Sequence, residues 1–145
     1  MRLLAWNIRQ GGGSRLPRIA DALKRHDADI VVLSEYRGGQ SALRVCAALH
    51  ALGYRHTTTL VPPPGRNGVL VAARRPFRDH GAVDMGLPEP YRMVSVDFTT
   101  FRVRHCWVDQ VILQIRTPIL VRVARILRSR RTPVFLAPPW RGDRS

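Results

Sequence analysis

Two polar residues close apolar runs near the start of the chain. Asn7 ends the run "RLLAWN", and Glu35 ends the run "IVVLSE". A carboxylate at the end of an apolar strand is costly to desolvate unless a positive group or a metal ion lies beside it. Hard divalent cations such as Mg²⁺ prefer oxygen ligands, usually one or two carboxylates together with phosphate and water. Asn7 and Glu35 are therefore candidate ligands of a metal site.

A second interpretation of the same residues stays open. Glu35 could instead form a salt bridge with Arg9 or Arg37, both of which lie close to a predicted strand end. Asn7 could simply cap a turn, because its side chain can hydrogen-bond to backbone two residues further on. The spacing alone does not favour the metal over the salt bridge.

The elements that must position these two residues follow from the hydrophobic pattern. Residues 2–8 and 29–35 are typical of buried strands. Between them, three consecutive glycines form a turn, and Ser14 is expected to cap a helix. A strand–helix–strand unit favours a right-handed parallel crossover, which places both strand ends at one edge of the sheet. The expected inward face of the helix carries Leu16, Ile19, Ala20 and Leu23, with Pro17 tolerated in the first turn.

The rest of the chain alternates between helical and extended patterns. A second helix is predicted over residues 39–52, ended by Gly53. Its inward residues are expected to be Leu43, Cys46, Ala47 and Leu49. Strands are predicted at 54–61, 68–74, near 80–85, 92–98, 101–107 and 132–136, and an amphipathic basic helix within 116–131. The order predicts an α/β fold.

Length and composition limit the classes of protein to consider. A chain of 145 residues suits one domain, within which residues 1–98 precede a more basic segment, 99–145. The net charge of +14 is compatible with a polyanionic partner, although the near-total use of arginine in place of lysine also fits a coding bias of the genome.

No run of residues is long and apolar enough to span a bilayer, and no signal-peptide pattern is present, so we expect a cytoplasmic protein. The isolated Cys46 and Cys106 are expected to be reduced. No feature indicates an obligate protein partner.

Three segments resemble the first signature blocks of the endonuclease/exonuclease/phosphatase superfamily, namely "LLAWNIR", "DADIVVLSEYRGG" and "RNGVLVAARRPF". The resemblance covers roughly residues 2–98. It implies an α/β fold in which the chain forms part of a four-layer α-β-β-α sandwich. It also implies Mg²⁺-dependent, or Mn²⁺-dependent, hydrolysis of nucleic acid or another phosphoester. On this resemblance Glu35 is the metal-ligating carboxylate, and Asn7 helps to hold the metal or its water shell.

The third block has candidate phosphate contacts at its two ends, Asn67 and Arg74. Each also has an ordinary structural interpretation. Asn67 and Gly68 could supply the positive φ angles of a turn, and Arg74 could be a solvated residue at a strand end.

The later motifs of the family are absent from this sequence. The family continues with Gly-Asp-x-Asn and closes with Ser-Asp-His, whereas this chain ends "TPVFLAPPWRGDRS", with Asp143 in a different context. The resemblance therefore implies a fragment, a frameshifted product or a degenerate copy that is weakly active or inactive, because general acid–base catalysis alone is worth about 10²–10⁴-fold in rate. The alternative is a non-catalytic remnant that binds nucleic acid through its basic surface. Dependence on a metal distinguishes the two.

Overall fold

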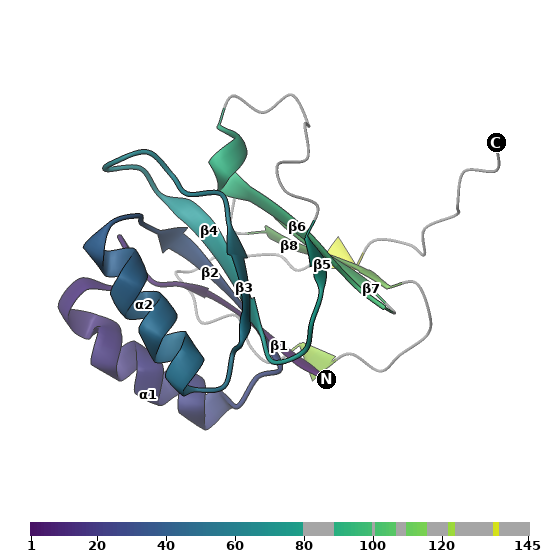
Figure 1. The fold of residues 1–145 in the computed structure, drawn as a ribbon. Helices are drawn as coiled ribbons and strands as arrows, with labels where there is room; N and C mark the ends of the chain where they lie inside the picture. The colour runs from purple at the N-terminus through teal and green to yellow at the C-terminus, as the bar shows by residue number, and fades with distance from the viewer. Residues whose placement is uncertain (80–88, 100, 107–109, 116–121, 124–134, 137–145) are drawn as a thin grey trace.

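The computed structural model describes residues 1–79, 89–99, 101–106, 110–115, 122–123 and 135–136, and the statements below concern these residues (Figure 1). They form two β-sheets that pack face to face, with two α-helices against the outer face of the first sheet.

The first sheet carries both predicted site residues. Its strand order is β3-β4-β2-β1-β9. β1 and β2 are parallel, in a register that runs from Leu3 opposite Ile30 to Asn7 opposite Ser34. β4 is antiparallel to both β2 and β3. The bounds are β1 Arg2–Asn7, β2 Ile30–Tyr36, β3 His56–Thr59, β4 Gly68–Ala73 and β9 Arg122–Val123.

Two helices make the crossovers on one side of this sheet. A short 3-10 helix, η1 (Gly13–Arg15), leads into α1 (Leu16–His26), which joins β1 to β2, and α2 (Gln40–Ala51) follows β2. Apolar side chains from alternate positions of the strands pack against both helices and exclude water from this layer. The buried members of this core are Leu4, Ile8, Ile19, Leu23, Ala28, Val31, Leu33, Tyr36, Val45, Leu49, Tyr54, Leu70 and Ala72.

The second sheet packs on the other face of the first. Its order is β10-β8-β7-β6-β5. The bounds are β5 Arg78–Asp79, β6 Met93–Phe98, β7 Phe101–Cys106, β8 Gln110–Ile115 and β10 Phe135–Leu136, with the 3-10 helix η2 at Pro90–Arg92. The core between the sheets contains Leu3, Ala5, Ile30, Val32, Val69, Val71, Ala73, Val94, Val96, Phe98 and Val103. Helix, sheet and sheet are three layers of the predicted α-β-β-α sandwich, which confirms the α/β class and its partial form.

The start of α1 differs from the prediction. Ser14 does not cap the helix, because it lies within η1, and the helix begins at Leu16 without a side-chain cap. The chain leaves the glycine turn in a tight 3-10 turn, closed by the bond from Arg15 N–H to the Gly12 carbonyl, 3.0 Å. Pro17 does lie in the first turn, and of the predicted inward residues Ile19 and Leu23 are buried.

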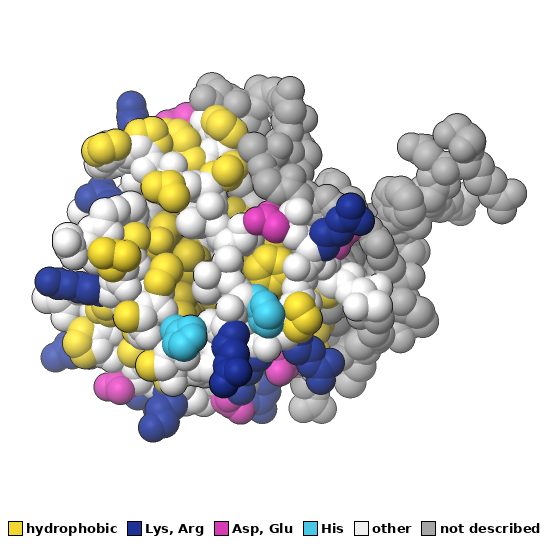
Figure 2. Space-filling model, in the orientation of Figure 1, with side chains coloured by type: hydrophobic (Ala, Val, Ile, Leu, Met, Phe, Trp, Pro, Cys, Tyr) yellow, Lys and Arg dark blue, Asp and Glu magenta, His cyan; other side chains and the backbone are white. Residues whose placement is uncertain are grey.

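The inward face of α2 is rotated from the one predicted. Leu43 is 65% exposed and Ala47 is exposed, whereas Val45 is buried with Leu49. The stripe that packs is Ala42, Val45, Cys46, Leu49 and Leu52, which follows the three- and four-residue spacing of a helix. Figure 2 shows apolar side chains on the outward surface of this part of the molecule.

Two of the strands described in the second half of the chain are not predicted from the sequence. β8 is not among the predicted strands, and Arg122 and Val123 form β9, parallel to β1, where the sequence predicts a helix over 116–131. At these two residues the backbone pairs with Arg2 and Leu3 of β1, and valine favours an extended strand. The predicted strand near 80–85 and most of that helix lie outside the described residues, and β7 and β10 confirm the strands expected around 101–107 and 132–136.

Candidate metal centre

Asn7 and Glu35 meet at the carboxyl ends of β1 and β2. The Asn7 amide Nδ2 donates a hydrogen bond to Glu35 Oε1, 2.8 Å away. The backbone N–H of Gln10 donates to the other carboxylate oxygen, Oε2, at 3.0 Å. The parallel crossover inferred from the sequence therefore brings the two residues together, and the carboxylate is held through both of its oxygens.

A β-bulge turns Glu35 toward Asn7. Ser34 pairs with Val69 and Tyr36 with Gly68, so Glu35 has no partner on β4. Its φ angle is 56°, in the left-handed region. Such a conformation costs on the order of 1–3 kcal/mol in a residue other than glycine, and a bulge re-aims the side chain. Strain of this kind is concentrated at functional sites, so it supports a specialised role for Glu35.

Asn7 performs the turn-capping role as well. Its Oδ1 accepts a hydrogen bond from the Arg9 N–H at 2.8 Å, which is the local bond of an Asx-turn. The other alternative does not occur, because within the described residues Glu35 forms no ion pair with Arg9 or Arg37. Neutral N–H groups thus hold the carboxylate, and its negative charge is not cancelled by either arginine.

The two predicted phosphate contacts lie at opposite ends of the sheet. Asn67 lies just before β4, at the end where Gly68 pairs with Tyr36, and its Oδ1 accepts from Arg37 Nε at 2.8 Å. Positive φ in that turn occurs at Gly65, not at Asn67 or Gly68. Because β4 is antiparallel, its other end lies away from Glu35.

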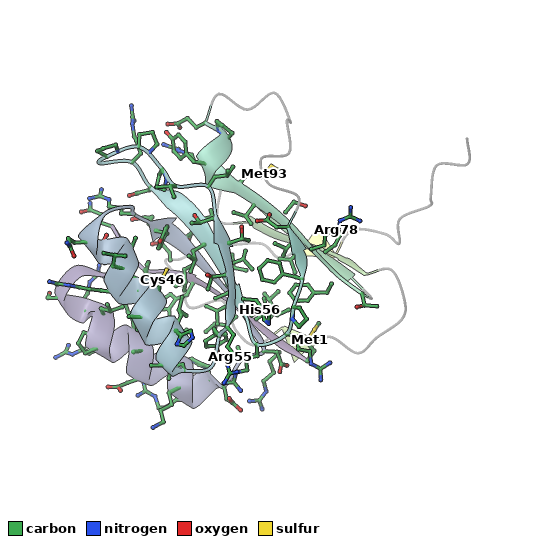
Figure 3. All side chains as sticks on the ribbon, in the orientation of Figure 1. Met1, Cys46, Arg55, His56, Arg78 and Met93 are labelled. Carbon is green, nitrogen blue, oxygen red and sulfur yellow. The ribbon has the colours of Figure 1, made fainter. Side chains whose placement is uncertain are left out.

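Arg74 lies at that far end and has structural partners there. Its Nη2 is 2.6 Å from Asp27 Oδ1, and its guanidinium lies over the Tyr54 ring, 5.3 Å from the centroid. Met1 and Arg55 are labelled at this end in Figure 3. The structure does not bring Arg74 to Asn7 and Glu35.

The donor set fits a hard divalent cation. An ionised carboxylate has about four lone-pair positions, and each Glu35 oxygen accepts one hydrogen bond from the described residues. A Mg²⁺ ion commonly takes one or two carboxylates and completes its shell with water and phosphate. No group of three or more His, Cys, Asp or Glu side chains suited to a metal is found in the described part of the chain.

Comparison with known proteins identifies the family. A model of the Endonuclease/Exonuclease/phosphatase family matches residues 4–137. The chain belongs to this family. The match includes Asn7 and Glu35 and continues past Phe98. A search of curated proteins gave no match.

Solved structures show the same fold. The chain is similar to an AP endonuclease from Archaeoglobus fulgidus, with 19% identity, a TM-score of 0.53, and coverage of 79% of this chain and 40% of that one. It is also similar to the 3′ phosphatase NExo from Neisseria, solved with a product DNA hairpin, at 22% identity and a TM-score of 0.55, covering 77% and 40%. The chain thus spans about two fifths of the length of these structures.

A pocket of about 310 Å³ adjoins this family member's candidate centre. Trp6 and Asn7 of β1 and the following Ile8 line one side. Arg15 at the end of η1 and Arg18, Ile19 and Ala22 of α1 line the other. On the helix side of β2, burial and a contact with Cys46 raise the pKa of the Tyr36 phenol. Cys46 extends from α2 (Figure 3) and is a free thiol, as predicted.

Two parts of this site are missed by sequence reasoning. The first is the loop after β1, in which five consecutive residues, from Arg9 to Gly13 at the start of η1, have positive φ angles. The three glycines hint at it, but Arg9 and Gln10 do not. The second is Arg15, which binds this loop and is not part of any sequence motif.

Neither described helix meets the length and hydropathy needed to cross a membrane.

Proposed function

We propose that this family member is a phosphoester hydrolase in kind, with nucleic acid as the favoured substrate class, and that its activity depends on Mg²⁺ or Mn²⁺. We expect the activity to be weak or lost, because the Gly-Asp-x-Asn and Ser-Asp-His motifs are absent from the sequence. The observation that carries the proposal is the strained, bulged Glu35, which is held by Asn7 and by the loop backbone and is not paired with Arg9 or Arg37. The left-handed backbone conformation of Glu35 lowers the stability of the fold, because a regular strand conformation at this position would avoid the strain.

In this proposal Glu35 holds the cation and Asn7 orients the carboxylate. A bound divalent cation would polarise a phosphoryl oxygen and favour an ionised water. The chain's own residues would supply the binding surface, because arginines lie in the segments at this end of the sheet and would neutralise phosphate charge. They lie on the loop after β1, at the start of α1, after β2 and before β4: Arg9, Arg15, Arg18, Arg37 and Arg66. Asn67 is a candidate phosphate contact beside them.

The proposal is tested by thermal unfolding with and without Mg²⁺. Binding at ten times Kd stabilises the folded state by about 1.4 kcal/mol, so we expect the melting temperature of the wild-type chain to rise. Glu35→Gln should abolish this rise. It should also lower the free energy of unfolding by about 1–3 kcal/mol, because one acceptor oxygen becomes an N–H donor facing another donor.

Glu89→Gln is the matched control. Glu89 is the only other glutamate of the chain and is ion-paired with Arg92 at 2.7 Å, so this variant should keep the response to Mg²⁺. No Mg²⁺ response in the wild type would reject the metal centre. Cleavage of bis(4-nitrophenyl) phosphate that stops with EDTA and returns with Mg²⁺ would support hydrolysis, whereas salt-sensitive DNA binding that ignores EDTA would indicate a non-catalytic binding protein.

A further inference from the structure

The loop from Arg9 to Gly13 determines how the two site side chains are held. All five φ angles lie between 51° and 82°. The Arg9 N–H binds Asn7, the Gln10 N–H binds the Glu35 carboxylate, and the Gly11 N–H binds the Glu35 carbonyl at 2.8 Å. A change in any of these peptide planes would therefore move or release the carboxylate. Two of the five residues are not glycine, so the loop needs contacts that keep it in this conformation.

Arg15 makes such contacts with the same peptide groups. Its Nη2 donates to the Ile8 carbonyl oxygen at 3.1 Å and to the Arg9 carbonyl oxygen at 2.6 Å. The Ile8 carbonyl shares a peptide plane with the Arg9 N–H, and the Arg9 carbonyl shares one with the Gln10 N–H. A trans peptide directs its C=O and N–H to opposite sides. Arg15 thus binds one side of the two planes whose other side holds Asn7 and Glu35.

This arrangement has two physical consequences. The guanidinium fixes the rotation of both planes, because turning either one would break a charge-assisted hydrogen bond. A cation bound at a peptide oxygen also polarises the attached N–H, which strengthens the bond that this N–H donates. Both effects act on the position of the Glu35 carboxylate, and they reach it through the backbone of the loop.

We propose that Arg15 is a positioning residue of the Asn7–Glu35 centre, acting through the peptide groups at residues 8–10. Its importance for catalysis rests on the proposed function, but its effect on the loop does not. Comparable outer contacts of metal sites change metal affinity by about 10–100-fold when they are removed.

The test compares Arg15→Ala with Arg25→Ala. Arg25 is exposed in the last turn of α1, so the control removes the same charge at the other end of the helix. Amide hydrogen exchange, followed by NMR, should be at least about tenfold faster at Gln10 and Gly11 in Arg15→Ala, with β2 amides unchanged as a reference for global stability. The apparent Mg²⁺ affinity, from thermal shifts, should fall about 10–100-fold. Arg25→Ala should change neither.

Rescue separates positioning from general structural loss. Methylguanidinium should restore slow exchange and Mg²⁺ affinity in Arg15→Ala, and Arg15→Lys should retain part of both if the alanine variant folds poorly. Wild-type exchange at Gln10 and Gly11 in Arg15→Ala would overturn the inference, as would exchange that accelerates equally throughout β2. If the wild type shows no Mg²⁺ response, the proposed function fails, while the exchange comparison still decides the role of Arg15.

Discussion

At the scale of single residues, Asn7 shows why an amide and not a carboxylate closes β1. Its oxygen accepts from Arg9 and its nitrogen donates to Glu35, so both halves of the amide are used. An aspartate can supply only the first bond, and it would place a second negative charge beside Glu35. The amide therefore stabilises an isolated carboxylate in the absence of metal.

We accordingly expect Asn7→Asp to destabilise the metal-free protein by about 1–3 kcal/mol, since a bond to a charged group is lost and two carboxylates repel each other. Mg²⁺ should recover much of this loss because a dication favours the acidic pair. Urea unfolding at several Mg²⁺ concentrations measures both effects. Asn67→Asp is the control, because the new carboxylate could still accept the hydrogen bond that Arg37 donates to Asn67. An Asn7→Asp protein as stable as the wild type without metal would contradict this account.

At the scale of elements, the loop after β1 is packed closely against α2. A Cβ placed on Gly11 would lie 3.0 Å from Ser41 Oγ and 3.3 Å from Arg37 Cβ, at a φ of +74°. Gly13 has a φ of +51° but nothing within 4 Å of its Cβ position. The two glycines therefore share an unusual backbone conformation and differ in the space around them.

Substituting each by alanine should separate these two causes. Gly13→Ala is expected to cost about 1–2 kcal/mol from the left-handed conformation alone. Gly11→Ala should cost clearly more, because its methyl group displaces Ser41 or the loop, and it should also weaken the Mg²⁺ response. The free energies of unfolding from urea titrations decide the matter. Equal losses in the two variants would show that close packing against α2 is unimportant.

The elements also show how far sequence reasoning reaches. The strand–helix–strand unit and the meeting of Asn7 with Glu35 follow from apolar periodicity and crossover handedness. The β-bulge at Glu35 does not follow from the sequence, because "IVVLSEY" has the pattern of one regular strand. The bulge is seen only in the structure, as the positive φ angle of Glu35 and the shift in pairing with β4. Likewise, α2 has apolar residues on more than one side, so packing against the sheet, not periodicity, selects Val45 over Leu43. Arg15 escapes prediction because one arginine among many carries no pattern.

At the scale of the whole molecule, the two ends of the first sheet have different chemistry. One end carries the strained carboxylate and several arginines. The other end joins α1 to β4 through the pair of Asp27 and Arg74 and the stacking of Arg74 on Tyr54. The Tyr54 hydroxyl is buried and donates to the Ala28 carbonyl at 2.8 Å. This separation predicts that stability and metal binding can be changed independently.

Arg74→Gln is the variant that tests the separation. Its ion pair is partly exposed, with side-chain exposures of 37% for Arg74 and 62% for Asp27, so solvent limits its value to about 0.2–1 kcal/mol. The contact with Tyr54 adds about 0.5–1 kcal/mol. We therefore expect a loss of about 1 kcal/mol in urea unfolding and an unchanged rise in melting temperature with Mg²⁺. The neighbouring Arg75 is exposed and forms no ion pair within the described residues, so Arg75→Gln should change neither quantity. If Arg74→Gln keeps full stability but loses affinity for DNA or inorganic phosphate relative to Arg75→Gln, Arg74 is a phosphate contact after all, and the two ends of the sheet are not separate in function.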